Sequence, residues 1–523
     1  MTMPPVTAAQ SNAAHLPPLI RALLEPGRYP HPVAQVQLAE THISWVLLTG
    51  DYAYKIKKPV DLGFLDFSTL EKRQQACADE VRLNRRLEPD IYLGVVAITG
   101  SPEAPGFDGS GEVFEYAVKM RQFPAGDTLD LLDERGALGT VQIDQLATRV
   151  AHFHLNDCPV ASQDSPWGEP DAIARPAAEN FELLFARVAD PAQRELLTTL
   201  QDWSNAEHQR LAPLMRERKR LGRVRECHGD LHLGNLAWVD GRLVIFDCIE
   251  FSAALRWIDV ISEVAFCYMD LLHRERRELA MRFLNAWLEA TGDYAGMALL
   301  RYYAVYRAMV RAKVAALRAG QIEEGQREAS NAEASVCLCL AAELTRVPPL
   351  ELWITHGLSG CGKTTLSQSW LQQYGMIRLR SDVERKRLAG LDPLARSGAE
   401  TGEGLYTLEF NRRTYEQLAR LAEGLLGAGW PVLVDAAFLS RWERDLFHDL
   451  ARKSNAFFRI LDIYAEAKTL RERISRREAA GTDASEADLQ VLQLQIDHEQ
   501  PLAAEELDVT TRIVNTLPLT SPD

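Results

Sequence analysis

Residues 227–235 read Cys-His-Gly-Asp-Leu-His-Leu-Gly-Asn, and residues 244–247 read Val-Ile-Phe-Asp. A carboxylate, Asp230, thus stands five residues before the amide of Asn235, and an apolar strand then delivers a second carboxylate, Asp247. One carboxylate can accept the proton of an attacking hydroxyl, while the amide and the second carboxylate can hold Mg²⁺ on nucleotide phosphates. A lone His-Gly-Asp would ordinarily be a turn, but its partners at this spacing predict a phosphoryl-transfer site with Asp230 as the catalytic base.

The spacing H-x-D-x-x-x-x-N, followed by a strand and Asp, has the form of the protein-kinase catalytic loop. Gly229 stands where protein kinases usually carry Arg, and in this the chain resembles the aminoglycoside phosphotransferase and the choline or fructosamine kinase families. The resemblance covers about residues 15–345. It implies an α+β two-lobed, protein-kinase-like fold and a small-molecule kinase that uses ATP and Mg²⁺. The aminoglycoside name is a fold-level analogy, since no residue pattern indicates an aminoglycoside pocket.

The segment Tyr52–Lys57 is predicted to be a strand that follows a turn at Thr49–Asp51. Alternation places Lys55 and Lys57 on one face of this strand and Ile56 on the other. The Ala-x-Lys pattern resembles the third-strand lysine of kinase-like folds. That resemblance implies that Lys55 grips the α and β phosphates of ATP, with Lys57 as the alternative.

A helix is predicted after this strand, because Ser68 to Glu71 form a start signal and the run ends before Pro89. In kinase-like folds this helix supplies the Glu that pairs with the strand lysine. By that resemblance the candidate is Glu80, and Glu71 and Asp79 are the alternatives.

Three further features of the first half follow from the same resemblance. Val118–Gln122 resembles the hinge between kinase lobes, where backbone groups would bind adenine. No G-x-G-x-x-G occurs in this lobe, so the turn Thr49–Asp51 is its only candidate phosphate loop. Asp259 resembles a structural acid of the phosphotransferase family, and we expect it to anchor a loop or cap a helix.

The second half opens with an apolar strand, Leu350–His356, and residues 357–365 then read Gly-Leu-Ser-Gly-Cys-Gly-Lys-Thr-Thr. This matches G-x-x-x-x-G-K-[ST] between a strand and a helix. Backbone N–H groups would cradle phosphates, Lys363 would reach the β and γ oxygens, and Thr364 would supply a hydroxyl to Mg²⁺. The predicted nucleotide-binding residues are Gly357, Ser359, Gly360, Cys361, Gly362, Lys363, Thr364 and Thr365.

Two later strands of this half end on acids. Residues 430–435 form an apolar run ending at Asp435, the Walker B form, whose carboxylate would lie near Mg²⁺. Alternating strands and helices predict an α/β P-loop NTPase fold with a parallel, doubly wound sheet. Residues 350–523 resemble the P-loop kinases that include gluconate kinase, polynucleotide kinase and zeta-toxin-like proteins. The resemblance implies that Asp382, at the end of residues 376–382, orients or deprotonates the substrate hydroxyl.

An arginine-rich run, residues 470–478, follows the last of these strands. Arg473 and Arg477 are candidate catalytic residues, because a lid carrying them could close over the transferring phosphates. The alternative is that they are i, i+4 members of a solvated helix.

Length and charge limit the classes of protein. With 523 residues the chain holds about two to four domains. Its net charge is −15, and residues 350–523 hold 21 Lys and Arg against 26 Asp and Glu, leaving 37 against 47 for the rest. Two acidic halves argue against a broad nucleic-acid or anionic-membrane surface, although a local basic cleft in the C-terminal domain stays open.

The cysteine pattern and the hydropathy point to the cytoplasm. Eight cysteines occur without a C-x-x-C pair, which suits a reducing compartment. The chain shows no signal-peptide pattern and no apolar run of about eighteen residues, so we expect neither export nor a membrane partner.

The expected domains are a mobile tail at 1–14, a phosphotransferase-like domain at 15–345, a linker at 346–349 and a P-loop kinase domain at 350–523. The preferred function is an ATP-dependent tandem phosphotransferase that acts on hydroxyls of small molecules at two separate ATP–Mg²⁺ sites. One alternative makes one half a nucleotide-binding module that gates the other. Another makes the C-terminal half an RNA or polynucleotide-end kinase, suggested by Arg378, Arg380, Arg385, Lys386 and Arg387. The sequence does not reveal the substrates or the oligomeric state.

Overall fold

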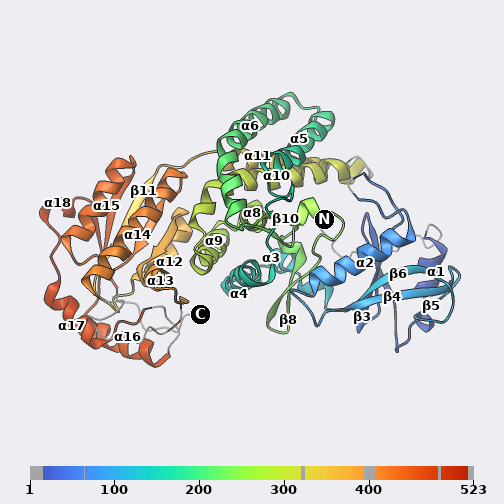
Figure 1. Cartoon of the computed structure of the whole chain (residues 1–523), viewed down its shortest axis with the longest axis horizontal. Coiled ribbons are helices and arrows are strands. Elements are labelled where there is room, and N and C mark those ends of the chain that lie inside the picture. The colour runs from blue at the N-terminus through green and yellow to red at the C-terminus, as the bar shows by residue number, and fades with distance from the viewer. Residues whose placement is uncertain are drawn as a thin grey trace. The chain divides into compact units, whose positions relative to one another are not determined.

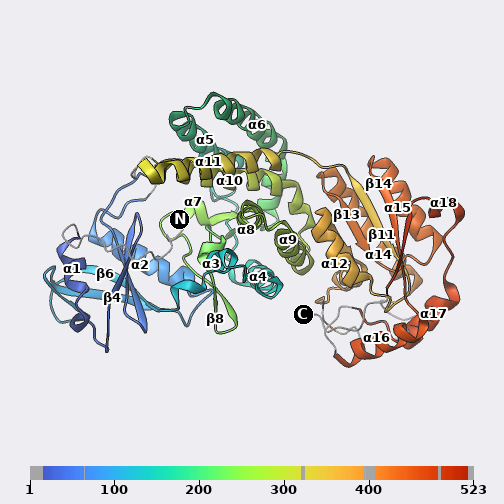
Figure 2. The same cartoon turned by 180° about the vertical axis from the view of Figure 1, so that it is seen from behind.

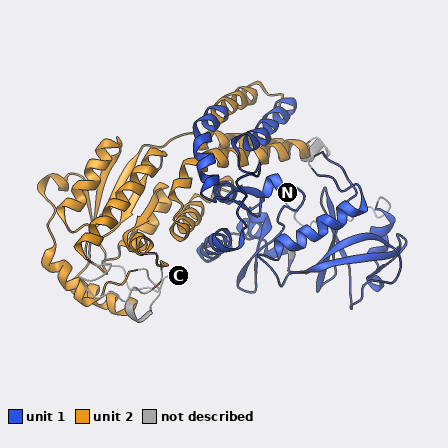
Figure 3. Ribbon diagram, in the orientation of Figure 1, with its two compact units in different colours: residues 1–187, 205–270 blue, residues 188–204, 271–523 orange. Residues whose placement is uncertain are grey.

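The computed structural model of the protein describes residues 16–63, 65–319, 324–393, 395, 407–480 and 485–515. The chain divides into two compact units, residues 1–187 with 205–270 and residues 188–204 with 271–523 (Figure 3). The tail predicted at 1–14 lies outside the described residues. The predicted domain boundaries, including the linker at 346–349, stay a prediction.

The first unit begins with an antiparallel sheet in the order β1-β2-β3-β6-β4-β5 (Figure 1). Its strands are β1 (Gln37–Glu40), β2 (Ser44–Leu48), β3 (Tyr52–Lys57), β4 (Tyr92–Ser101), β5 (Ala104–Phe107) and β6 (Val113–Arg121). Alternation along β2 and β3 sends Val46 and Ala53 into one buried cluster and Tyr54 and Ile56 into another. Helix α1 (Pro18–Leu23) contacts β5.

Helix α2 (Leu70–Asn84) packs on β4 and β6. Its N-cap is Thr69, whose side chain accepts a hydrogen bond from Lys72 N at 3.3 Å, one residue later than the predicted start. The helix also ends earlier than predicted, at Asn84, because a turn occupies the residues before Pro89.

The rest of the first unit is mainly helical and carries a β8–β9 hairpin. Leu236 pairs with Ile245, and Phe246 N donates to Asn235 O at 3.1 Å. The hairpin therefore brings Asn235 and Asp247 to the same end. The elements are α3 (Leu129–Glu134), α4 (Thr140–His152), α5 (Pro170–Arg187), α6 (Pro191–Arg220), β7 (Val224–Glu226), β8 (Leu236–Val239), β9 (Arg242–Ile245), α7 (Ala253–Arg256), β10 (Trp257–Asp259) and α8 (Val260–His273), of which α6 and α8 cross the division between the units.

The second unit contains a five-stranded sheet in the order β12-β13-β11-β14-β15, with every pair parallel (Figure 2). Its strands are β11 (Glu351–His356), β12 (Ile377–Arg380), β13 (Val432–Asp435), β14 (Phe457–Tyr464) and β15 (Thr510–Val514). The helices are α9 (Arg277–Thr291), α10 (Met297–Ala319), α11 (Glu324–Leu344), α12 (Lys363–Tyr374), α13 (Ser381–Leu388), α14 (Leu408–Gly427), α15 (Arg441–Lys453), α16 (Ala467–Ala480), α17 (Leu489–His498) and α18 (Ala504–Leu507).

The structure confirms the predicted fold class, an α+β kinase-like part followed by an α/β P-loop part with a parallel sheet. One predicted strand was too long: the strand expected to end on Asp382 ends at Arg380, and Asp382 lies in the first turn of α13. Among the described helices none is both long and apolar enough to cross a membrane.

Candidate active sites

The catalytic loop of the first unit brings Asp230 and Asn235 together. Asn235 Nδ2 donates to Asp230 Oδ2 at 3.1 Å and to the Asp230 backbone oxygen at 3.0 Å. Asn235 Oδ1 is buried and has no hydrogen-bond partner among the described atoms. Because buried polar atoms are nearly always satisfied, this amide oxygen fits a metal ligand.

Asp247 follows β9 with a backbone φ of 67°, in the left-handed region that residues other than glycine seldom adopt. Its backbone N–H donates to Tyr92 Oη at 3.1 Å, and its carboxylate pairs with Lys55. Burial alone would raise the pKa of Asp247, but the ammonium of Lys55 lowers it below its ordinary value. Asp247 therefore stays charged, as a metal ligand must.

Both predicted lysines of β3 contact Glu80. Lys55 Nζ lies 2.9 Å from Glu80 Oε1, and Lys57 pairs with Glu80 and with Glu250. Burial disfavours a charged amine, yet the carboxylates of Asp247, Glu80 and Glu250 raise the pKa of Lys55 well above its ordinary value. Lys57 has no exposed side-chain surface, whereas Lys55 lines a pocket. This geometry favours Lys55 as the phosphate ligand.

A mostly apolar pocket lies beside Lys55 and Asp247 and includes the predicted hinge. Its wall runs from the sheet through Met120–Phe123 to the catalytic loop. Gln122 Oε1 accepts a hydrogen bond from Gly50 N at 2.9 Å, which links the hinge to the predicted phosphate turn. The lining residues are Ala39, Val46, Leu48, Ala53, Lys55, Glu80, Ile91, Tyr92, Met120, Arg121, Gln122, Phe123, Thr128, Asp130, Leu131, Gly234, Phe246 and Asp247. An apolar slot with charged groups at one end suits a purine nucleotide.

The catalytic loop is held from below by Glu263 of α8. Its carboxylate accepts hydrogen bonds from His228 N at 3.1 Å and Gly229 N at 2.6 Å, and it lies 3.1 Å from His154 Nε2. Gly229 has a φ of +91°, and a Cβ there would lie 2.9 Å from Leu255 O. The backbone therefore requires glycine at the position where protein kinases carry Arg.

Sequence reasoning missed Glu263 and Glu250, and a signal for Glu263 exists. It is an acid inside the apolar stretch 260–269, and a buried charge must find partners. Asp259 behaves as predicted: it pairs with Arg218 at 2.7 Å and accepts from Ile261 N at 3.0 Å at the start of α8.

The P-loop of the second unit joins β11 to α12. Lys363 Nζ donates to the backbone oxygens of Gly357 at 2.9 Å and Leu358 at 3.0 Å. Asn515 Nδ2 donates to Cys361 O at 2.8 Å from the end of β15. These bonds fix the loop from inside and from the neighbouring strand. The remaining residues predicted for the cradle, Ser359, Gly360, Gly362, Thr364 and Thr365, lie in the same loop and in the first turn of α12.

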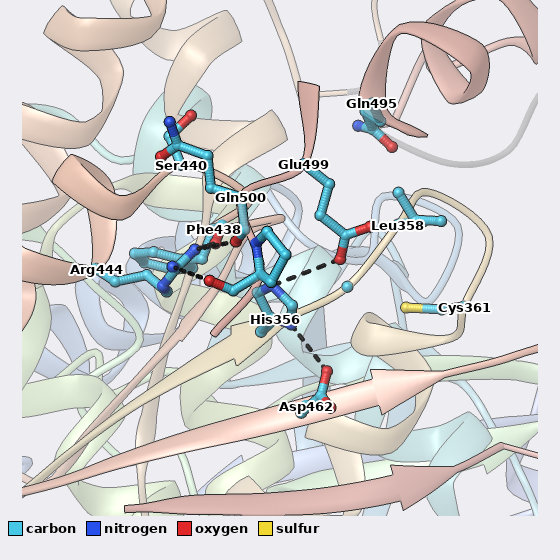
Figure 4. Close-up of polar contacts among 12 residues, drawn as sticks. His356, Leu358, Cys361, Phe438, Ser440, Arg444, Asp462, Gln495, Glu499 and Gln500 are labelled. Carbon is cyan, nitrogen blue, oxygen red and sulfur yellow. Dashed lines mark hydrogen bonds and ion pairs between the residues drawn. The ribbon is translucent and has the colours of Figure 1, made fainter. Parts of the chain in front are cut away.

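The base of the P-loop is braced by α17 and the residue after it (Figure 4). His356 Nδ1 lies 2.8 Å from Asp462 Oδ1, and His356 Nε2 lies 3.8 Å from Glu499 Oε1. Gln495 Oε1 accepts a hydrogen bond from Ser359 N at 2.8 Å. The loop thus depends on side chains far along the chain.

Asp435 ends β13, and its partner in the sheet register is Arg380 of β12. Its carboxylate is buried, and Asp435 Oδ2 has no hydrogen-bond partner among the described atoms. This unsatisfied oxygen fits a ligand of Mg²⁺.

Asp382 stands at the same edge of the sheet, two residues after Arg380. Arg385 Nη1 lies 4.0 Å from Asp382 Oδ1. Burial would raise the pKa of Asp382, but Arg385 and Arg380 lower it below its ordinary value. Asp382 is therefore ionised at neutral pH and able to orient a hydroxyl.

The two lid candidates contact backbone oxygens. Arg473 Nη1 donates to Gly360 O and Cys361 O, each at 3.3 Å, and Arg477 Nη2 donates to Ala487 O at 2.6 Å. Residues 481–484, which follow α16, lie outside the described residues. Arg473 thus lies against the P-loop, while a role of either arginine in transfer stays a prediction.

Comparison with known proteins places these two sites in known families. The model of the phosphotransferase enzyme family matches residues 74–300, and the model of an AAA domain matches residues 352–502. The uncharacterized proteins Rv2004c of Mycobacterium tuberculosis and Mb2027c of Mycobacterium bovis are each 30% identical to this chain over 458 residues, 87% of the chain and 89% of each relative. The chain belongs to the family of these mycobacterial proteins. It is a kinase, and its domain families use ATP with Mg²⁺.

Three solved structures each align with one part of this kinase. An aminoglycoside 2'-phosphotransferase-IIIa mutant bound to GDP shows a TM-score of 0.37 at 14% identity, covering 62% of this chain and 97% of that chain. Choline kinase from Cryptosporidium parvum shows 0.37 at 12%, covering 59% and 89%. A gluconokinase from Sinorhizobium meliloti shows 0.24 at 18%, covering 33% and 86%.

Proposed function

We propose that the protein is a tandem phosphotransferase that moves the γ-phosphoryl group of ATP to hydroxyls of small molecules at two separate sites. The observation that carries this is the same in both units. Each site holds a buried side-chain oxygen without a donor, Asn235 Oδ1 or Asp435 Oδ2, next to a conformationally fixed loop. Mg²⁺, when bound, would neutralise charge on the phosphate oxygens there.

At the first site, the apolar pocket would take the adenine and Lys55 would bind the α and β phosphates. Asn235 and Asp247 would hold the metal ion. Asp230, oriented by the amide of Asn235, would accept the proton of the acceptor hydroxyl as the phosphoryl group transfers.

At the second site, Lys363 would exchange its two backbone partners in the P-loop for the β and γ oxygens of ATP. Thr364 and Asp435 would hold the metal ion, and Asp382 would orient the acceptor hydroxyl. Arg473, which already lies against the P-loop, and Arg477 would stabilise the charge on the transferring group.

A polynucleotide-end kinase finds less support in the second unit. Arg378 and Arg380 pair with Glu289, Arg387 pairs with Glu384, and Lys386 Nζ lies 3.1 Å from Glu486. Each of these four cations thus faces a carboxylate, which weakens the basic groove that an RNA end would need.

The test is transfer of label from γ-labelled ATP into a small-molecule extract, with full-length wild type, Asp230→Ala and Lys363→Ala. We expect two sets of labelled products, one lost in each variant, and their masses would name the substrates. A variant that loses no product would remove the catalytic role from its site and leave that unit as the gating module. Label that appears on RNA ends while labelled small molecules are absent would favour the polynucleotide alternative.

We also propose that the protein works in the cytoplasm. None of its cysteines forms a disulfide in the described structure, which supports a reducing compartment. Fractionation with an antibody against the chain would test this.

A further inference from the structure

Helix α9 covers the free edge of the parallel sheet, and both lie in the second unit (Figures 1 and 2). Strand β12 is the edge strand. The side-chain amide of Asn285 takes the place of a neighbouring strand: Arg378 N donates to Asn285 Oδ1 at 2.7 Å, and Asn285 Nδ2 donates to Met376 O at 3.1 Å. An amide side chain presents the donor and acceptor of a peptide group, so it satisfies the open edge.

Glu289, one turn further along α9, binds two arginines of that strand. Its carboxylate lies 3.3 Å from Arg378 Nη2 and 2.6 Å from Arg380 Nη1. Although burial opposes ionisation, Arg380 and Arg378 lower the pKa of Glu289 below its ordinary value. Glu289 is therefore a charged partner of both guanidinium groups.

The two arginines lead from Glu289 into the P-loop site. Arg378 Nη1 donates to Thr364 O and to Ser367 Oγ, each at 3.2 Å, in the P-loop helix α12. Arg380 stands two residues before Asp382, and the charges of Arg385, Arg380 and Arg477 together lower the pKa of that carboxylate against the effect of burial. Glu289 thus contacts Arg378, which binds the backbone of the proposed metal ligand Thr364. It also contacts Arg380, which stands two residues before Asp382, the proposed acid of the acceptor site.

The end of α9 also holds α13, the helix that carries Asp382. The guanidinium of Arg387 donates to Glu289 O and pairs with Glu384. Gly292 ends α9 with a φ of +68°, and a Cβ there would lie 2.6 Å from Arg387 Nε. The left-handed backbone therefore favours glycine at this position, and a larger residue would also displace the Arg387 side chain.

From these contacts we infer that Glu289 is a positioning residue of the P-loop site: it sets Arg378 against Thr364 and holds the guanidinium of Arg380, two residues before Asp382, in an ion pair. The inference rests on the proposed function of that site. Glu289 lies within residues 74–300, the match of the phosphotransferase model, and outside residues 352–502, the match of the AAA model. The P-loop site is therefore completed by a residue from outside its own family segment.

Loss of the Glu289 charge should free Arg380 to bind Asp382 more tightly. An ion pair with Arg380 would make Asp382 a weaker partner for the acceptor hydroxyl. The defect should then be curable by removing Arg380, which a loss of sheet packing would not be.

The experiment uses full-length protein with Asp230→Ala, so that only the P-loop site transfers label from γ-labelled ATP to the extract and to water. Glu289→Gln keeps the shape and the acceptor oxygen of the side chain. Glu278→Gln is the matched control, since Glu278 is exposed in the first turn of the same helix. Circular dichroism and thermal melting check that each variant is folded.

We expect Glu289→Gln to lower Lys363-dependent transfer at least about tenfold and to move the acid limb of its pH profile to lower pH. The control should stay within about twofold of the parent, and Glu289→Gln with Arg380→Gln should recover most of the lost rate. An unchanged rate in Glu289→Gln, or no recovery in the double variant, overturns the inference while the proposed function stands. No Lys363-dependent transfer in the parent itself overturns both.

Discussion

Single side chains decide how each candidate site can bind its metal ion. Asn235 uses its nitrogen to orient Asp230 and keeps its oxygen unsatisfied, and Asp435 keeps one carboxylate oxygen unsatisfied. In both cases the protein leaves open the atom that Mg²⁺ prefers. Gly229 and Glu263 fix the backbone conformation of the catalytic loop and are not proposed to contact the substrate.

Gly229→Ala tests the backbone requirement of the catalytic loop. The substitution forces a side chain into a left-handed conformation and against Leu255 O, so we expect a loss of about 2–3 kcal/mol in unfolding free energy and loss of first-site turnover. Gly241→Ala is the control, since Gly241 also has a positive φ, +75°, with nothing within 4 Å, and should cost about 1 kcal/mol. Urea unfolding measures both; equal losses would contradict the role of Leu255.

Glu263 makes the stability of the catalytic loop dependent on pH. Burial would raise the pKa of Glu263, but the hydrogen bonds from His154 and Gly229 lower it to about 2 from an ordinary value of 4.5. Since the folded pKa is the lower one, the stabilisation, about 3 kcal/mol, is present above pH 4.5 and is lost as pH falls toward 2.

The stability difference between wild type and Glu263→Gln should therefore be constant from pH 7 to about 5 and shrink below it. Urea unfolding at several pH values measures this difference. Glu278→Gln, an exposed change, should show no such trend. A difference that stays constant down to pH 3 would refute the assignment.

At the level of secondary-structure elements, one face of strand β3 carries two lysines with different surroundings. Alternation brings both to Glu80 of α2, but only Lys55 also reaches Asp247 and the pocket. Lys57 lies between Glu80 and Glu250 with no exposed surface. Strand β3 and helix α2 thus share one buried charge network, in which Lys55 borders the pocket and Lys57 does not.

Substitution of each lysine by Met should separate a structural role from a phosphate-binding role. Lys57→Met leaves the buried carboxylate of Glu250 without the cation it pairs with and leaves Glu80 with Lys55 alone, so we expect a loss of about 3–5 kcal/mol in unfolding free energy. Lys55→Met should instead lower first-site ADP formation about a hundredfold with a smaller loss of stability. Urea unfolding and ADP assays on both variants decide. The reverse pattern would make Lys57 the phosphate lysine.

At the scale of the whole molecule, the chain combines two nucleotide-binding folds. Wild type should therefore bind two ATP per chain in the presence of Mg²⁺, and Lys363→Ala should bind one. Removal of Mg²⁺ with EDTA should abolish label transfer at both sites, because the ion proposed to neutralise the phosphate charge there is then removed. Equilibrium dialysis measures the stoichiometry. One ATP per wild-type chain would rule out two separate sites.

Spacing along the chain predicts the fold class, which the structure confirms, and it proposes most of the candidate ligands. Asp230, Asn235 and Asp247 follow one another along a loop and a hairpin, and residues 357–365 form one strand-to-helix turn, so spacing alone reveals them. Such local patterns can be recognised in the sequence because residues close together in the chain are held near one another by the backbone itself.

Contacts between charged groups that are far apart in sequence can be seen only in the tertiary structure. Lys57 and Glu250 are 193 residues apart in sequence, and Glu289 is 91 residues from Arg380. The proposed choice of Lys55 over Lys57, the support of the loop by Glu263 and the ion pairs of Glu289 with two arginines of β12 all depend on such pairings. Sequence spacing does not predict these pairings. A buried charge needs a partner, but that requirement does not specify where in the chain the partner lies.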